Sequence, residues 1–169
     1  MIRHGMPALL VTIVFLIFAP VHAEEPPPVP VMVFPFELED KSAGAGLIPP
    51  DSFDRRYLLE AAQVTRDMLA GTGRYHVLDV SDVAPPRSDR EALRYCGGCE
   101  GALAKQHGAA LAVLGVVTRV NRTEHTMFIR IIDADTGKPV AVGFTDLRMG
   151  ANHAWPRTAR WLMTRHILK

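Results

Sequence analysis

The sequence predicts an α/β domain: a mixed β-sheet with helices packed on it, in the element order β-α-β-α-β-β-β-α. In the first half of the chain, apolar β-rich runs alternate with segments of helical periodicity, as in a sheet covered by helices. In the second half, three β-branched runs are separated by short polar turns, and a helical apolar stripe follows them. At 169 residues, 48% of them hydrophobic, the chain is long enough for one domain with its own core.

The N-terminal segment, residues 1–23, is predicted to be a secretory signal peptide. Arg3 gives it a basic start, and its apolar run over 8–18 is too short for a membrane-spanning helix, which needs about 20 apolar residues. Small residues precede a predicted cleavage site after Ala23. No cysteine directly follows the apolar run, so we expect no lipid anchor at a new N-terminal cysteine. After cleavage of residues 1–23 we expect no membrane-spanning segment and a periplasmic or secreted location.

After cleavage, residues 24–30, which read EEPPPVP, are expected to form a Pro-rich tether with an extended polyproline conformation. Residues 31–169 are then expected to form a single α/β domain. It opens with a predicted buried strand over 31–36, VMVFPF, which ends near Pro35 because proline cannot donate to a β-ladder. A polar, glycine-containing loop is expected over 37–50.

The first helix is predicted by apolar residues that recur every three or four positions. Asp51 or Ser52 can cap its N-terminus, and Gly71 with Gly73 is expected to end it. The stripe comprises Phe53, Tyr57, Ala61, Val64 and Met68.

A strand and a second helix are predicted to follow. Residues 75–80 alternate in polarity and favour a strand, whereas 81–95 favour a loop with room for one helical turn. A short helix is expected over 99–107, closed by Gly108.

The second half is predicted to form a three-stranded meander and a last helix. Runs rich in β-branched residues cover 111–120, 126–132 and 139–147, and the turns between them have hairpin lengths. Residues 154–168 carry the last helical stripe.

The chain contains five short motifs: an apolar run ending in Pro-Phe at 31–36, Gly-x-Tyr-x-Val at 73–77, Gly-Ala at 108–109, Gly-x-Val at 115–117, and Asp-x-x-Thr-Gly at 133–137. With these motifs the chain resembles the N-terminal domain of TolB and related envelope domains of the curli-secretion and penicillin-binding-protein-activator type. This resemblance implies a mixed α/β fold and action by protein contact.

A closer resemblance rests on Cys96, Cys99, Trp155 and Trp161. The chain is similar to a family of small exported proteobacterial proteins of unknown function, which carries a cysteine pair before its second helix and a Trp-containing C-terminal helix. The resemblance spans about residues 31–168 and implies the fold and compartment, without carrying over any catalytic residue.

Cys96 and Cys99 form a Cys-x-x-Cys motif before the second helix. In an oxidising compartment such a pair usually forms a disulfide, worth about 2 kcal/mol for so short a loop. A redox site is one alternative, because a helix N-terminus favours a thiolate. A metal site is another, although only Glu100 and His107 lie nearby in sequence and zinc needs about four ligands. The third alternative to a disulfide is a free or intermolecular thiol.

The other chemistry-bearing residues form no catalytic or metal-binding motif. Asp133 and Asp135 are predicted to belong to a turn between two strands. The histidines of the mature chain show no metal-site spacing, and His166 is expected to be a partly buried packing residue. We therefore predict no catalytic, cofactor-binding or metal-ligating residue, and no cofactor.

Trp155 and Trp161 are the candidate interaction residues. They lie six positions apart, so they occupy different faces of a helix. We expect core packing for such residues, with one of them able to reach the surface, where an exposed Trp favours binding.

The charge balance narrows the function classes. Without residues 1–23 the chain carries 18 Lys and Arg and 18 Asp and Glu, interspersed along the sequence, which disfavours nucleic acid as a partner. The leading hypothesis is a non-enzymatic envelope protein, a protein-interaction or accessory module that holds an envelope protein at a sheet edge or in a groove beside the first or last helix. The alternative is a redox or small-molecule accessory protein centred on Cys96 and Cys99.

Overall fold

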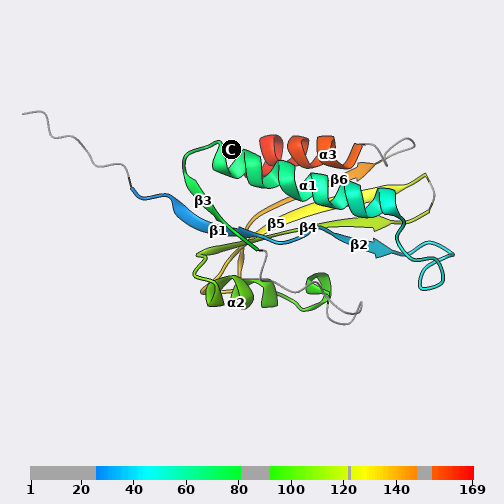
Figure 1. Cartoon of the computed structure of the whole chain (residues 1–169), viewed down its shortest axis with the longest axis horizontal. Helices are drawn as coiled ribbons and strands as arrows, with labels where there is room; N and C mark the ends of the chain where they lie inside the picture. Colours follow the sequence, from blue (N-terminus) through cyan, green and yellow to red (C-terminus); the bar gives the residue numbers. More distant parts are fainter. Residues whose placement is uncertain (1–25, 81–91, 122, 148–153) are drawn as a thin grey trace, which may run out of the picture.

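The computed structural model confirms the predicted mixed α/β fold. Among the residues that it describes, three α-helices pack against one six-stranded mixed sheet (Figure 1). The predicted signal peptide and its cleavage site lie outside these residues. The structure describes residues 26–80, 92–121, 123–147 and 154–169.

The sheet combines a parallel half and an antiparallel half. Its strand order is β3-β1-β4-β5-β6, and β2 pairs with β4 beyond the end of β1. β1 runs parallel to β3 and β4, whereas β4, β5 and β6 form the predicted antiparallel meander. The strands are β1 (Val29–Val33), β2 (Glu37–Asp40), β3 (Tyr75–Leu78), β4 (Leu111–Arg119), β5 (His125–Asp133) and β6 (Pro139–Leu147).

The helices cover both faces of the sheet. α1 and α3 lie side by side on one face, and α2 lies on the other (Figure 1). The last predicted helix is divided, because a wider π-helical turn, η4, continues α3. The helical elements are α1 (Ser52–Ala70), η2 (Leu93–Tyr95, a single 3-10 turn), α2 (Cys99–Gln106), α3 (Trp155–Leu162) and η4 (Met163–Ile167).

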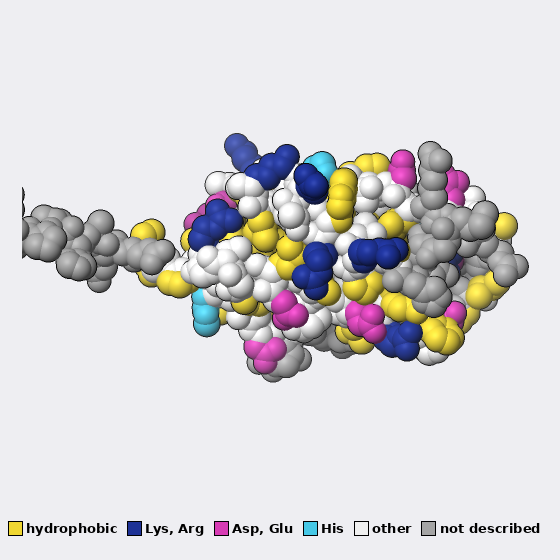
Figure 2. All heavy atoms as spheres, turned by 90° about the horizontal axis from the view of Figure 1, so that it is seen from above, with side chains coloured by type: hydrophobic (Ala, Val, Ile, Leu, Met, Phe, Trp, Pro, Cys, Tyr) yellow, Lys and Arg dark blue, Asp and Glu magenta, His cyan; other side chains and the backbone are white. Residues whose placement is uncertain are grey.

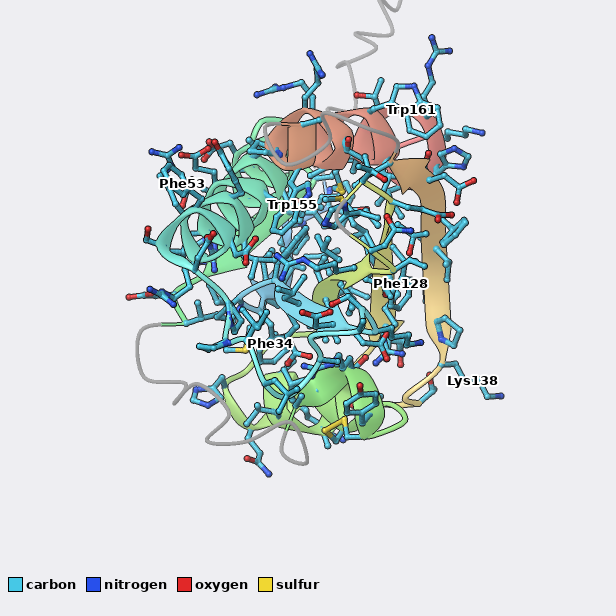
Figure 3. The ribbon with its side chains drawn as sticks, turned by 90° about the vertical axis from the view of Figure 1, so that its right-hand side faces the viewer. Phe34, Phe53, Phe128, Lys138, Trp155 and Trp161 are labelled. Atoms are coloured by element: carbon cyan, nitrogen blue, oxygen red, sulfur yellow. A yellow bond between two sulfur atoms is a disulfide. The ribbon has the colours of Figure 1, made fainter. Side chains whose placement is uncertain are left out.

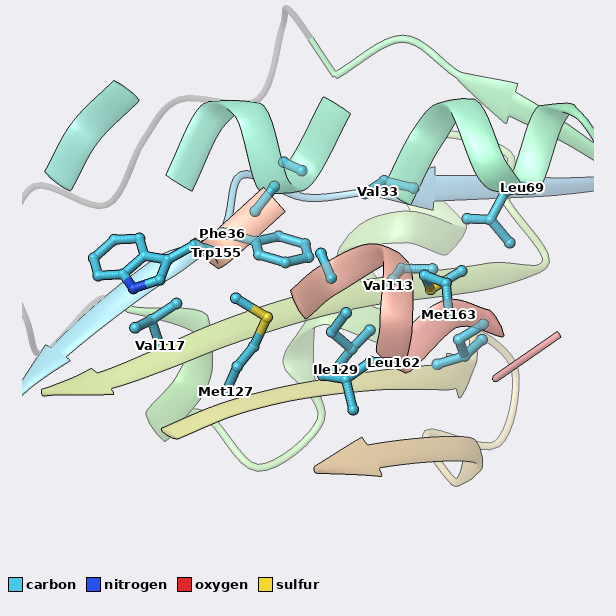
Figure 4. Packing of buried hydrophobic residues seen from close by; sticks show 14 of the residues in the cluster. Val33, Phe36, Leu69, Val113, Val117, Met127, Ile129, Trp155, Leu162 and Met163 are labelled. Atoms are coloured by element: carbon cyan, nitrogen blue, oxygen red, sulfur yellow. The ribbon is translucent and has the colours of Figure 1, made fainter. Parts of the chain in front are cut away.

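The hydrophobic core has two parts, one on each face of the sheet. The larger part joins α1, α3 and η4 to the sheet and includes Phe36, Val113, Met127, Ile129 and Leu162 (Figure 4). The smaller part lies under α2 and includes Met32, Phe34, Ala104, Leu114 and Ile132.

The predicted cap of α1 is confirmed and is completed by a residue that the sequence did not single out. Asp51 accepts a hydrogen bond from the backbone N–H of Asp54, and the carboxylate of Asp54 accepts one from the backbone N–H of Asp51. This reciprocal pair satisfies two N–H groups that a helix start leaves open. None of the helices in the described residues is long and apolar enough to cross a membrane.

Several strand ends differ from the predictions, and two of the differences have a clear cause. Residues 37–40, expected to begin a loop, form β2, because the chain leaves the ladder after Val33 and pairs with β4 again from Glu37. β1 begins at Val29, inside the expected tether, because the N–H of Val29 donates to Arg74 and the carbonyl of Pro30 accepts from Ala110. Only the carbonyl of Pro30 is needed there, so its missing N–H costs no ladder bond.

Candidate functional site

Cys96 and Cys99 form the predicted disulfide, at the N-terminus of α2. Gly97 and Gly98 between them both have positive φ angles, of 67° and 116°, which glycine adopts without steric cost. The two glycines therefore turn the chain sharply enough to bring the sulfurs together. Both cysteines are exposed, and the free-thiol alternative does not apply in this oxidised form.

A group of possible metal ligands includes the same pair. Cys96, Cys99 and Glu100 place one ligand atom each within 4.8 Å of one another, and His107 is not part of the group. Zinc binds cysteine as the thiolate, which a bridged sulfur cannot supply. The oxidised site is thus unsuited to zinc.

Near the disulfide, four charged side chains form two ion pairs, and the sequence predicted neither pair. The carboxylate of Glu37 accepts hydrogen bonds from the backbone N–H groups of Leu93 and Arg94, at 2.8 and 3.1 Å, and pairs with the Arg94 guanidinium at 3.1 Å. Fully buried Glu100 forms an ion pair with Arg130 of β5 at 2.5 Å. Removing one partner of such a buried pair costs more than the pair itself contributes, so these contacts fix η2 and α2 on the sheet.

Asp133 and Asp135 form the predicted turn between β5 and β6. One carboxylate oxygen of Asp133 accepts hydrogen bonds from the backbone N–H and the hydroxyl of Thr136, each at 2.8 Å, and these bonds lower the pKa of Asp133. Asp135 pairs with Lys105 of α2 at 2.9 Å. Both carboxylates therefore have local partners.

The histidines are dispersed. His76 and His107 are exposed, and His153 lies outside the described residues. His166 is exposed as well, so its expected partial burial is wrong: its ring lies tilted against that of Trp161 at the outer end of the last helix, with ring centroids 5.1 Å apart.

The two tryptophans separate as the helical spacing predicts (Figure 3). Trp155 is completely buried, with its ring 6.2 Å from Tyr57 and 5.8 Å from His125. Trp161 is 46% exposed on the outer side of α3. The interaction hypothesis therefore rests on Trp161, and Trp155 serves the core.

A second charged cluster ties α1 to the sheet. Arg119 of β4 pairs with Asp54 of α1 at 2.5 Å and with Asp40 of β2 at 3.2 Å. Burial lowers the pKa of Arg119, but the bonds to Asp54 and Asp40 outweigh burial and raise it overall. Burial also lowers the pKa of neighbouring His125, and the Arg119 cation lowers it further.

Beside α1 the structure has a hollow of about 540 Å³, lined by the C-terminal half of the helix and by β3. Arg66 in its wall donates to the carbonyl of Val33 at 2.9 Å. Burial lowers the pKa of Arg66 although Asp79 and Asp67 oppose the shift. The Arg66 guanidinium thus stabilises the fold, because it donates to the last carbonyl of β1.

The edge strand β6 carries an exposed apolar stripe that the sequence did not reveal. Val140, Val142 and Phe144 are 58%, 52% and 58% exposed. They alternate along β6, and Phe144 lies directly opposite Phe128 of β5. The outer surface of α1 and α3 is different: basic, acidic and apolar side chains are interspersed there (Figure 2).

The chain is similar to solved structures from several bacteria. The lipoprotein GNA1162 from Neisseria meningitidis is 20% identical, with a TM-score of 0.48 over 74% of this chain and 84% of that one. The LpoB C-terminal domain from Salmonella enterica is 11% identical, with a TM-score of 0.45 over 76% and 87%. The PelC dodecamer from Paraburkholderia phytofirmans is 14% identical, with a TM-score of 0.44 over 82% and 85%. These likenesses assign no role to any residue.

No curated protein matches this chain. The expected likeness to TolB and to curli-secretion components stays a prediction. A protein family matches over residues 30–167, nearly the whole length of the expected domain. The chain therefore belongs to the family DUF3280, described as "Protein of unknown function (DUF2380)".

Proposed function

We propose that this chain is an exported, non-enzymatic module of the bacterial envelope that binds an extended segment of a partner protein along β6. The exported location rests on the pattern of residues 1–23, with a basic start, a short apolar run and a cleavage site. The single observation that carries the binding role is the exposed apolar stripe on an edge strand.

The stripe lies where a strand can be added. In the described part of the chain, β6 ends the strand order, so its outer backbone groups pair with no other strand. Natural edge strands usually protect themselves with charges, prolines or bulges. Here Pro139 and Asp146 stand near the two ends of β6, and the pairing with β5 shifts register beside Pro139. The side chains exposed between the two ends are Val140, Val142 and Phe144, which are all apolar.

These features favour an extended partner with apolar residues at alternate positions. Such a segment would take its main-chain hydrogen bonds from the edge of β6 and place every second side chain against the stripe. Trp161 would flank it on the helix side, because Trp161 contacts His166, and His166 lies over Gly143 of β6. An exposed Trp beside a strand edge is a typical anchor of a binding site.

The test is site-specific photo-cross-linking in the envelope of an expressing cell. A photoreactive residue at Val142 should give one dominant adduct, and the same residue at His76, on the opposite edge strand, should not. The cross-linked partner segment is then synthesised as a peptide. It should bind the purified chain and slow hydrogen exchange of the β6 amides.

Val142→Lys should weaken peptide binding at least tenfold, because it places a charge where the partner strand packs. Leu59→Lys, which changes a similarly exposed apolar residue on α1, is the matched control and should bind normally. Equal binding by both variants, or protection of amides outside β6, would refute the proposal. An adduct with a second copy of the chain would replace it with self-association.

A second candidate, a redox accessory role at Cys96 and Cys99, is favoured by a different observation. The sulfur of Cys96 lies 3.6 Å from a carboxylate oxygen of buried Glu100. This site is on α2, and its failure or success does not depend on β6.

A further inference from the structure

The environment of the disulfide is asymmetric, and Cys96 has most of the polar contacts. Its sulfur lies 3.1 Å from the carbonyl oxygen of Leu93 and 3.6 Å from Oε2 of Glu100. It also accepts the backbone N–H of Cys99 at 3.1 Å. No such contact is recorded for the sulfur of Cys99 among the described residues.

Two of these neighbours suit a thiol better than a disulfide. Both oxygens are hydrogen-bond acceptors, and a bridged sulfur carries no hydrogen to donate. After reduction, the S–H group of Cys96 would find these acceptors already in place. The oxidised structure thus already contains both hydrogen-bond acceptors that a reduced Cys96 would use.

The third neighbour suits a thiolate. The N–H of Cys99 is the first of α2, whose N-terminus favours negative charge. A negative charge on Cys96 would therefore meet one direct donor and the positive end of the helix dipole, and Glu100 no longer opposes it once its carboxylate has taken the proton of Cys96. These are the conditions under which the first cysteine of a Cys-x-x-Cys motif becomes reactive.

Glu100 is held for this role by Arg130. It is completely buried, and its other carboxylate oxygen pairs with the Arg130 guanidinium at 2.5 Å. The same guanidinium donates to the carbonyl of Leu93 at 3.5 Å. Arg130 therefore positions both oxygens that face the sulfur of Cys96.

From this geometry, which deepens the second candidate function, we propose that Cys96–Cys99 is a thiol–disulfide exchange site. Cys96 is the sulfur that forms and breaks bonds with the substrate, a dithiol or disulfide of another exported protein. Glu100 is its proton acceptor.

The exchange balances without a further reactant. A substrate thiolate attacks the sulfur of Cys96, the Cys96–Cys99 bond breaks, and Cys99 leaves as a thiolate. The second thiol of the substrate then attacks the substrate's own sulfur in the mixed disulfide and releases Cys96 as a thiolate beside the Cys99 N–H. The substrate dithiol is oxidised by two electrons, and its two protons end on Cys96 and Cys99. In the reverse direction Glu100 takes the proton of Cys96, whose thiolate attacks the substrate disulfide.

The test uses the full chain, reduced with dithiothreitol, freed of reductant and mixed with the aromatic disulfide 5,5′-dithiobis(2-nitrobenzoate). The reduced chain should keep its circular dichroism spectrum, release two coloured thiolates and regain its disulfide. Glu100→Gln should slow the reaction at least tenfold near pH 6.5. The difference should vanish above about pH 9, where thiols of pKa about 8.5 ionise without help. Glu60→Gln on α1 is the matched control.

The single variants Cys99→Ser and Cys96→Ser keep the proposal falsifiable should Glu100→Gln fail to fold. Cys96, alone in Cys99→Ser, should react at least tenfold faster near pH 6.5 than Cys99, alone in Cys96→Ser. Equal rates for the two thiols would overturn the proposal. So would a Glu100→Gln profile identical to that of the unaltered chain, or a disulfide that dithiothreitol reduces only after unfolding. None of these outcomes bears on binding at β6.

Discussion

The ring of Phe36 covers Gly115 so closely that a Cβ at Gly115 would collide with three of its carbons. Gly115 is the one residue of β4 without a side chain, and Phe36 is buried in the larger part of the core (Figure 4). β1 pairs with β4 up to Val113, and β2 pairs with it from Val116 onward. The missing side chain thus gives room for the ring of Phe36, which lies in the segment between β1 and β2, while both strands stay paired to β4.

Gly115→Ala is therefore expected to destabilise the fold by about 1–3 kcal/mol, the usual cost of overpacking a core. The added methyl group meets an aromatic ring, which cannot yield without moving the segment between β1 and β2. Urea unfolding followed by circular dichroism measures the change.

The same substitution in a Phe36→Leu background isolates the cause. If the ring is the obstacle, Gly115→Ala should cost at most half as much there, a coupling that a double-mutant cycle reads directly. An equal cost in both backgrounds would place the strain elsewhere.

β2 is the strand that the sequence did not predict. The periodic segments, such as the helix of residues 52–70 and the strand of residues 139–147, were predictable because their burial repeats along the chain. Glu37–Asp40 reads as a polar segment. Its burial depends on Leu93 and Arg94, which lie more than fifty positions away and satisfy the carboxylate of Glu37.

The candidate sites were also predictable from the sequence only in part. The spacing of Cys96 and Cys99 predicted their disulfide, and it placed Glu100 nearby. The partner that orients Glu100, Arg130, lies thirty positions later and follows from the pairing of β5 with the sheet. The stripe on β6 was hidden for another reason: which face of a strand stays uncovered depends on how far α2 extends over the sheet.

Asp54→Ala is expected to lower the free energy of unfolding by about 3 kcal/mol. The substitution removes the carboxylate that completes the helix cap and leaves Arg119, which is mostly buried, without its partner on α1. Glu60→Ala is the matched control on the same helix. It breaks an exposed pair with Arg56 and should cost less than about 1 kcal/mol. Similar losses for both variants in urea unfolding would contradict the structural role of Asp54.

The disulfide is expected to make only a modest contribution to the stability of the fold. Replacing both cysteines by serine should lower the free energy of unfolding by about 2 kcal/mol, because the bridge closes a loop of only four residues and restricts the unfolded chain little. The variant should keep the circular dichroism spectrum of the parent. A variant that cannot fold would contradict this prediction and assign the bridge a larger share of the stability.

The stability of the chain is expected to fall in mild acid because of His125. This side chain is buried beside Trp155, and neither of its ring nitrogens has a hydrogen-bond partner among the described residues. Burial lowers the pKa of His125, the Arg119 cation lowers it further, and Asp54 with Asp40 opposes the shift without cancelling it.

The sign of the effect follows from proton binding. Below about pH 6.5 the unfolded chain protonates His125 while the folded chain keeps it neutral, so the stability present above pH 6.5 is lost as the pH falls towards the lowered pKa. The loss approaches about 1.4 kcal/mol per pH unit for one proton. Urea unfolding at about pH 7.5 and 5.5 measures it. His125→Phe should remove this slope and exposed His107→Gln should keep it; a slope that survives in His125→Phe would assign the acid sensitivity to another group.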